Sequence, residues 1–185
     1  AMGIPDQDLM GLRTTMRKHI DSVKVERKEG MHAWTEDPYN TRVKERCQEI
    51  AARVKKEKIQ TVVWVGIGGS GLGPRVLQEV FEGPGTVEFL VVDTIDPSAL
   101  SVYLNIVDWT SALVVVVSKS GNTLETMSAF FLFWEQLQKA RKSRAAQRVI
   151  AITDPKKGPL RGFCVEHGIE MLPIPKDVGG RSCIV

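Results

Sequence analysis

The sequence predicts a doubly wound α/β domain with a five-stranded parallel sheet flanked by helices, preceded by two extra helices. Short β-rich runs recur from residue 59 onward, and a helical pattern follows each run before the next begins. Loops rich in glycine and serine follow two of these runs. Because strand–helix–strand connections are right-handed, this alternation produces a parallel sheet with helices on its faces.

Two helices are predicted ahead of the sheet. The first occupies residues 6–23, where apolar residues recur at helical spacing, and the pattern is lost over residues 24–40. The second covers residues 41–58 and ends in basic residues, which favour a helix C-terminus. We interpret that basic end as a solvated turn rather than a nucleic-acid patch. The predicted division is a helical segment at residues 1–58 and an α/β domain at residues 59–185.

The α/β part contains five predicted strands and four helices. The strands are expected at residues 61–65, 87–92, 113–117, 148–153 and 170–174. The helices are expected to end at Phe81 and to cover residues 97–107, 123–141 and 157–167. The third strand reads LVVVV, which is typical of a strand buried on both faces.

The helix at residues 123–141 carries the run FFLFW at residues 130–134. Such a run is apolar around most of the helix circumference, more than one side of a two-layer domain can bury. It indicates either a central helix of a thick core or an interface with another subunit or domain. We favour the interface.

Composition limits the classes of function. A net charge of +3 over 185 residues is mild and argues against nucleic acid as the main partner. The sequence shows no apolar run near the ~20 residues that span a bilayer and no signal-peptide pattern, so no membrane partner is expected. Its three cysteines, Cys47, Cys164 and Cys183, form neither a disulfide framework nor a zinc pattern. They suit the reducing cytoplasm.

A candidate anion site follows the third strand. The strand stops at SKSGNT, residues 118–123, and a helical pattern begins at once. Asn122 and Glu125 have the spacing of a capping box, which predicts a helix start near Thr123. Hydroxyl groups beside a helix N-terminus, with its free N–H groups and positive dipole end, form a place for a phosphate.

The loop after the first strand allows a second interpretation. GIGGSG at residues 66–71 fits GxGxxG, and Asp93 ends the second strand 22 residues past Gly71. These are elements of a dinucleotide-binding fingerprint, although a tight turn without a ligand explains the glycines equally well. In a parallel sheet both loops lie at the carboxyl edge, where ligands bind. A sugar phosphate that binds to both loops explains their presence at one edge better than a dinucleotide does.

Four ordered motifs carry a family resemblance. VGIGGSGLGP at residues 65–74 resembles the first signature of the glucose-6-phosphate isomerase family, and SKSGNTLET from residue 118 is similar to the phosphate loop of its sugar-isomerase (SIS) fold. ITDP at residues 152–155 and DVGGR at residues 177–181 resemble later segments of that family. The resemblance covers about residues 35–181 and implies a SIS-type sheet of the flavodoxin or Rossmann kind.

The resemblance also implies roles for individual residues. Ser118, Ser120 and Thr123 are expected to hold the substrate phosphate with Lys119 beside them, Gly69 and Ser70 to line the sugar, and Arg181 to lie near C1 and C2. Aldose–ketose isomerisation removes a proton α to a carbonyl, so a fixed guanidinium near the developing enediolate oxygen lowers the barrier. Binding the remote phosphate positions the reacting carbons.

Other features of the family are expected elsewhere. The resemblance implies an enzyme that uses no metal or nucleotide and forms a homodimer. Its general base, ring-opening histidine and late lysine lie beyond the arginine motif, so this chain is expected to be an amino-terminal part that is inactive alone. None of His19, His32 and His167 matches the family histidine. The alternatives are a stand-alone SIS module that senses a sugar phosphate and, third, a dinucleotide-binding domain.

Overall fold

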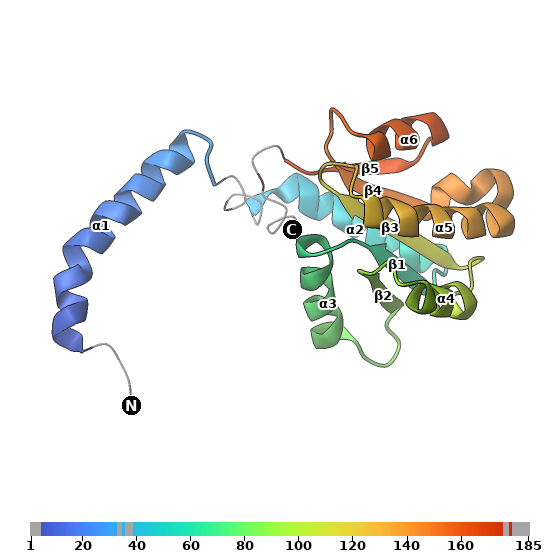
Figure 1. Ribbon diagram of the computed structural model, residues 1–185, viewed down its shortest axis with the longest axis horizontal. Coiled ribbons are helices and arrows are strands. Elements are labelled where there is room, and N and C mark those ends of the chain that lie inside the picture. The colour runs from blue at the N-terminus through green and yellow to red at the C-terminus, as the bar shows by residue number, and fades with distance from the viewer. Residues whose placement is uncertain (1–4, 33–34, 36–38, 176–177, 179–185) are drawn as a thin grey trace.

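The computed structural model describes residues 5–32, 35, 39–175 and 178. Within them one sheet carries helices on both faces, and α1 projects away from it (Figure 1). The elements are α1 (Asp6–Lys28), α2 (Thr41–Lys56), β1 (Thr61–Val65), α3 (Gly69–Phe81), β2 (Glu88–Val92), α4 (Pro97–Ile106), β3 (Ala112–Ser118), α5 (Leu124–Arg141), the 3-10 helix η3 (Lys142–Arg148), β4 (Val149–Thr153), α6 (Pro159–His167) and β5 (Glu170–Pro173).

The sheet has the strand order β2-β1-β3-β4-β5, and each neighbouring pair is parallel. The predicted fold class is therefore confirmed. The chain moves outward from β1 to β2, then crosses back to β3 and continues in the opposite direction. Right-handed crossovers consequently place α3 on one face and α4, α5 and α6 on the other. The direction reverses between β1 and β3, and this switch point is where ligands bind in such sheets.

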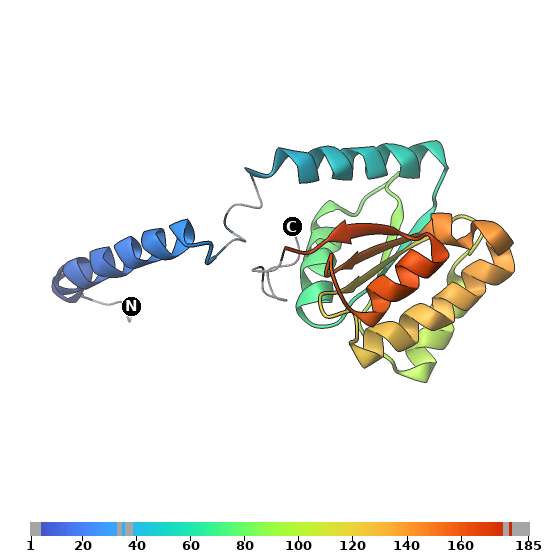
Figure 2. The ribbon, with the colours of Figure 1, turned by 90° about the horizontal axis from the view of Figure 1, so that it is seen from above.

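Two apolar cores lie on opposite faces of the sheet. The larger core packs one face of the strands against α4, α5 and α6, and the smaller one packs the other face against α2. Figure 2 shows α2 along one side of the sheet and α5 and α6 along the other. All seven residues of β3 are buried. The prediction of a central strand covered on both faces is therefore correct.

The second predicted helix belongs to this packing. Ile50 and Val54 of α2 contact the smaller core. Arg53 Nη1 lies 2.5 Å from Glu170 Oε2 on β5, and Arg46 pairs with the other carboxylate oxygen. Two arginines on α2 thus share one acidic side chain of the sheet edge. The helix ends at Lys56, two residues earlier than predicted, and Lys58 adopts a positive φ of 51°.

Helix α1 behaves differently. It begins as predicted and continues to Lys28, with acidic residues in its first turn and basic residues in its last, as the helix dipole favours. None of its residues is buried. The predicted apolar stripe is 43–55 % exposed at Leu9, Leu12, Met16, Ile20 and Val23. Among the residues that the structure describes, no helix is long and apolar enough to span a membrane.

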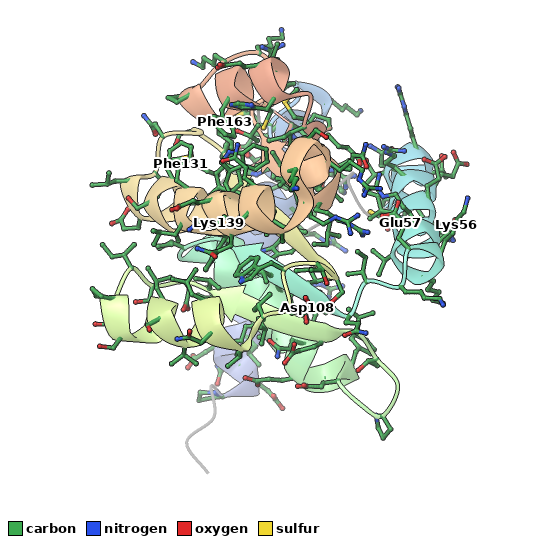
Figure 3. The ribbon with its side chains drawn as sticks, turned by 90° about the vertical axis from the view of Figure 1, so that its right-hand side faces the viewer. Lys56, Glu57, Asp108, Phe131, Lys139 and Phe163 are labelled. Carbon is green, nitrogen blue, oxygen red and sulfur yellow. The ribbon has the colours of Figure 1, made fainter. Side chains whose placement is uncertain are left out.

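The aromatic run on α5 divides between core and surface. Phe130 and Phe133 are fully buried and Trp134 is 8 % exposed, so these three side chains form core rather than the interface that the sequence favoured. Phe131 remains 44 % exposed. Its ring meets Phe163 of α6 edge to face, with centroids 5.3 Å apart (Figure 3). A sheet covered by three helices on this face is thick enough to bury most of the run.

We expect Cys164 to resist thiol reagents in the folded protein. Burial raises the pKa of its thiol from the ordinary 9.0 to about 11, so hardly any reactive thiolate exists at about pH 8. Cys47 on α2 is exposed. In a Cys183→Ser background, an aromatic disulfide reagent should therefore titrate one thiol in the native protein and two in urea. Rapid reaction of both thiols without denaturant would contradict the burial of Cys164.

Candidate functional site

A cleft opens beyond the carboxyl ends of β1, β3 and β4, at the switch point of the sheet. Its volume is about 1050 Å³. Three loops line it: the β1–α3 loop, the β3–α5 loop and the β4–α6 loop. The lining includes every predicted binding residue that the structure describes, namely Gly69, Ser70, Ser118, Lys119, Ser120 and Thr123. Arg181, the predicted catalytic residue, lies outside the described residues.

The β3–α5 loop is held by its own hydroxyl groups. Ser118 Oγ lies 3.0 Å from Thr123 Oγ1 and accepts a hydrogen bond from the Gly121 N–H at 3.1 Å. Ser120 Oγ accepts from the Asn122 N–H at 3.4 Å. Gly121 has a φ of 68°, a conformation that residues with a Cβ rarely adopt. These bonds curl the loop at the start of α5.

The start of α5 differs from the predicted capping box. Thr123, not Asn122, is the N-cap residue, and its side chain makes no capping hydrogen bond. The Thr123 hydroxyl contacts Ser118 instead. Glu125 lies in the first turn, where the helix dipole favours an acidic side chain. Among the residues that the structure describes, the first-turn N–H groups thus begin beside the cleft without a side-chain cap, which is the arrangement that binds anions.

The β4–α6 loop supports the β3–α5 loop from the neighbouring strand. Thr153 Oγ1 donates to the Ser118 carbonyl at 2.7 Å, and the Asp154 N–H donates to the Lys119 carbonyl at 3.2 Å. A Cβ added at Gly158 would lie 2.6 Å from the carbonyl oxygen of Ser120, so the two loops touch at backbone level. Two strands therefore fix the geometry of the β3–α5 loop.

The same loop adds charged residues that sequence reasoning did not assign to the site. Asp154 accepts the N–H groups of Lys156 and Lys157 at 2.7 and 3.1 Å. The Lys156 N–H is the main cause that lowers the pKa of the Asp154 carboxyl, and the charges of Lys157 and Lys119 lower it further. All four residues line the cleft. The parallel pairing of β4 with β3 puts both loops at one edge of the sheet. That pairing was the signal that could have assigned these charged residues to the cleft.

The β1–α3 loop packs closely against its strand. A Cβ at Gly71 would lie 2.4 Å from the Gly66 carbonyl oxygen, so only glycine allows this approach. Trp64 Nε1 of β1 donates to the Ser70 carbonyl at 2.7 Å. These contacts place Gly69 and Ser70 on the wall of the cleft. They explain the glycine pattern through backbone packing.

Asp93, the acidic residue of the dinucleotide interpretation, is paired within the protein. Arg75 Nη2 on α3 lies 3.0 Å from Asp93 Oδ1. A ribose hydroxyl would have to compete with this guanidinium for the carboxylate. The pair instead ties α3 to the end of β2.

Lys119 connects the cleft to a later segment of the chain. Its Nζ donates to the carbonyl oxygen of Val178. Val178 and Ile174 are buried and pack with Ile152. Lys119 is therefore engaged with the protein while it lines the cleft.

Comparisons with known proteins agree on one family. The family model described as phosphoglucose isomerase matches residues 10–185. A glucose-6-phosphate isomerase of Thermus thermophilus is 36% identical over 152 residues, which are 82% of this chain and 36% of that protein. The chain thus spans about a third of the length of this relative.

Two solved structures resemble the chain in fold and sequence. A hypothetical protein from Thermus thermophilus superposes with a TM-score of 0.87 at 31% identity, over 97% of this chain and 43% of that one. A glucose-6-phosphate isomerase from Chlamydia trachomatis gives a TM-score of 0.62 at 31% identity, over 75% of this chain and 27% of that one.

We expect Gly71→Ala to destabilise the protein strongly. The added methyl group overlaps the Gly66 carbonyl oxygen and must push α3 away from β1, at a cost of about 1–3 kcal/mol or more in the free energy of unfolding. The matched control is Gly162→Ala on α6, where a Cβ meets no atom within 4 Å. There alanine should stabilise the helix by up to about 1 kcal/mol. Equal urea midpoints for the two variants would contradict the close packing at Gly71.

Proposed function

The chain belongs to the phosphoglucose isomerase family, and on that premise we propose that it is the substrate-phosphate-binding part of a glucose-6-phosphate isomerase. The whole enzyme interconverts glucose 6-phosphate and fructose 6-phosphate. One observation carries the proposal: the hydroxyl-rich β3–α5 loop lies at the uncapped N-terminus of α5, on the wall of the cleft. On this proposal the enzyme is a cytoplasmic homodimer that works without a metal or nucleotide.

The phosphate is proposed to bind between the β3–α5 loop and the β4–α6 loop. Ser118, Ser120 and Thr123 supply hydroxyl donors, and the first turn of α5 supplies N–H groups and a positive dipole end. Lys156 and Lys157 add positive charge to the same cleft. Hydrogen bonds to a charged group contribute about 1.5–3 kcal/mol each. Two or three of them supply the roughly 4 kcal/mol that corresponds to a millimolar dissociation constant.

The sugar is proposed to extend from the phosphate toward the β1–α3 loop. Gly69 and Ser70 line that wall, where a glycine leaves room for the ring and a hydroxyl group offers a hydrogen bond. A phosphate bound at one end fixes the carbon chain along the cleft. Binding energy from this remote group then positions C1 and C2 for chemistry.

Proton transfer is proposed to need residues outside this chain. Asp154 is the one carboxylate among the described residues that line the cleft, and its lowered pKa and two N–H partners make it a weak base. The family resemblance assigns to Arg181 the stabilisation of the enediolate, because its guanidinium would lie near the negatively charged oxygen. The chain then binds the substrate, and the general base comes from the rest of the enzyme.

Titration of the purified, ¹⁵N-labelled chain with fructose 6-phosphate tests this proposal. We expect amide shifts in residues 118–123 at millimolar ligand, and about tenfold weaker binding by Ser120→Ala because one hydrogen bond to a charged group is lost. Ser101→Ala, which changes an exposed serine on α4, serves as the matched control and should bind normally. Unshifted loop amides would refute the binding site. Isomerase turnover by the purified chain would refute the absence of the base.

A further inference from the structure

Four arginines gather at the amino edge of the sheet, where the end of α2 meets the end of α5 and η3. They are Arg53, Arg141, Arg144 and Arg148, and the charges of the other three disfavour a positive charge on Arg148. Figure 3 looks onto this region, with Glu57 labelled at the end of α2. The substrate cleft lies at the opposite edge, about 20 Å away if β3 rises ~3.3 Å per residue over its seven residues.

Arg148 is the buried member of this arginine cluster. Its side chain is only 7 % exposed. Its Nη1 lies 2.8 Å from Glu57 Oε2, but at an angle that makes no hydrogen bond, and Nε has no acceptor either among the described residues. Burial is the main cause that lowers the pKa of this guanidinium, and Arg141 is the next. Within the described part of the chain, this buried cation therefore has one carboxylate partner, and that carboxylate is poorly aligned.

Two neighbouring arginines are also incompletely paired. Arg53 donates through Nη1 to Glu170, while its buried Nη2 has no acceptor in the described part of the chain. Arg141 donates through Nη1 to the Thr110 carbonyl at 3.0 Å, while its buried Nε finds none within the same described ranges. Buried polar atoms are nearly always hydrogen-bonded in native proteins. Four buried guanidinium nitrogens thus make no hydrogen bond within the described residues, which favours an anionic acceptor at this place.

We propose that the arginine cluster binds a phosphate-type oxyanion at a second site, separate from the substrate cleft. The guanidinium fork matches the oxygens of phosphate, and a dianion balances the repulsion among the four arginines. Access is available from solvent, because Arg144 is exposed and the side chains of Arg53 and Glu57 are 33 % and 37 % exposed. The anion takes the place of Glu57 on the arginines as that carboxylate turns outward.

Binding at this site would strengthen the junction of α2 with α5 and η3. A ligand that binds only the folded state raises its stability in proportion to the logarithm of its concentration. The site therefore makes the stability of the sheet's amino edge depend on phosphate, independently of the substrate.

Phosphate titration of the purified, ¹⁵N-labelled chain at constant ionic strength tests the site through the arginine Nε signals. We expect the Nε signals of Arg53, Arg141 and Arg148 to shift. Arg144→Gln should weaken this response about tenfold, because one charged contact is lost, and leave the amides of residues 118–123 unaffected. Ser120→Ala should weaken the phosphate response of the amides of residues 118–123 and leave the arginine Nε response unaffected. The arginine Nε signals report on the second site and the amides of residues 118–123 report on the cleft. Failure of one site can therefore be distinguished from failure of the other.

Nε signals that stay unshifted at millimolar phosphate, or that shift equally with added chloride, would overturn the proposal. Arg148→Met gives a second measurement through thermal unfolding. Phosphate should raise the melting temperature of Ser120→Ala more than that of the double variant Ser120→Ala/Arg148→Met, in which both sites are impaired, and an equal rise in the two would also overturn the proposal. If Arg148→Met does not fold, Arg144→Gln replaces it in the same comparison. Glycerol phosphate, titrated in parallel, shows whether an organic phosphate or free phosphate binds more tightly.

Discussion

The candidate site depends on the hydrogen bonds that join the loops after β3 and β4. Thr153 and Asp154 donate to the carbonyl groups of Ser118 and Lys119, and these bonds hold the β3–α5 loop in one curled conformation. The loop in turn leaves the first turn of α5 without a side-chain cap. An anion is then the natural acceptor for those N–H groups. Parallel pairing of β3 with β4 is what brings the two loops together.

The sheet separates two different electrostatic environments. At its carboxyl edge, hydroxyl groups, lysines and a helix N-terminus surround an open cleft. At its amino edge, the C-terminal turns of α2 and α5 bring arginines together, as helix dipoles favour at such ends. The first edge is preorganised for a ligand that must enter and leave. The second lies away from the cleft, so the anion that we propose there would act on stability rather than on chemistry.

Most of the fold was predictable because its signals are local. β-branched runs located the strands, and the alternation of strands with helices determined the parallel topology. Whether an apolar helix face is buried was not predictable, since burial depends on which surfaces pack against that face. The stripe on α1 proved exposed, whereas Phe130, Phe133 and Trp134 of α5 entered the core. Residue propensity and hydrophobic periodicity identify an apolar helix face, but they do not identify the element that packs against it.

The position of the candidate site was predictable where a single motif indicated it, and was not predictable where two separate segments form it together. The SKSGNT loop and the β1–α3 loop were placed correctly at one edge of the sheet. The capping box of Asn122 and Glu125 did not form, because the N-cap lies one residue later at Thr123. The Thr123 hydroxyl contacts Ser118, which sequence spacing does not reveal. Asp154, Lys156 and Lys157 were not predicted to line the cleft, since their place there follows from the pairing of β4 beside β3. The unpaired nitrogens of Arg148 are visible only in three dimensions.

A crystal structure of this chain with fructose 6-phosphate tests the central claim most directly. We predict that the phosphate oxygens lie within hydrogen-bond distance of the hydroxyl groups of Ser118, Ser120 or Thr123 and of the first-turn N–H groups of α5. The sugar should extend toward Gly69 and Ser70. A phosphate bound elsewhere, with the β3–α5 loop empty, would contradict the claim.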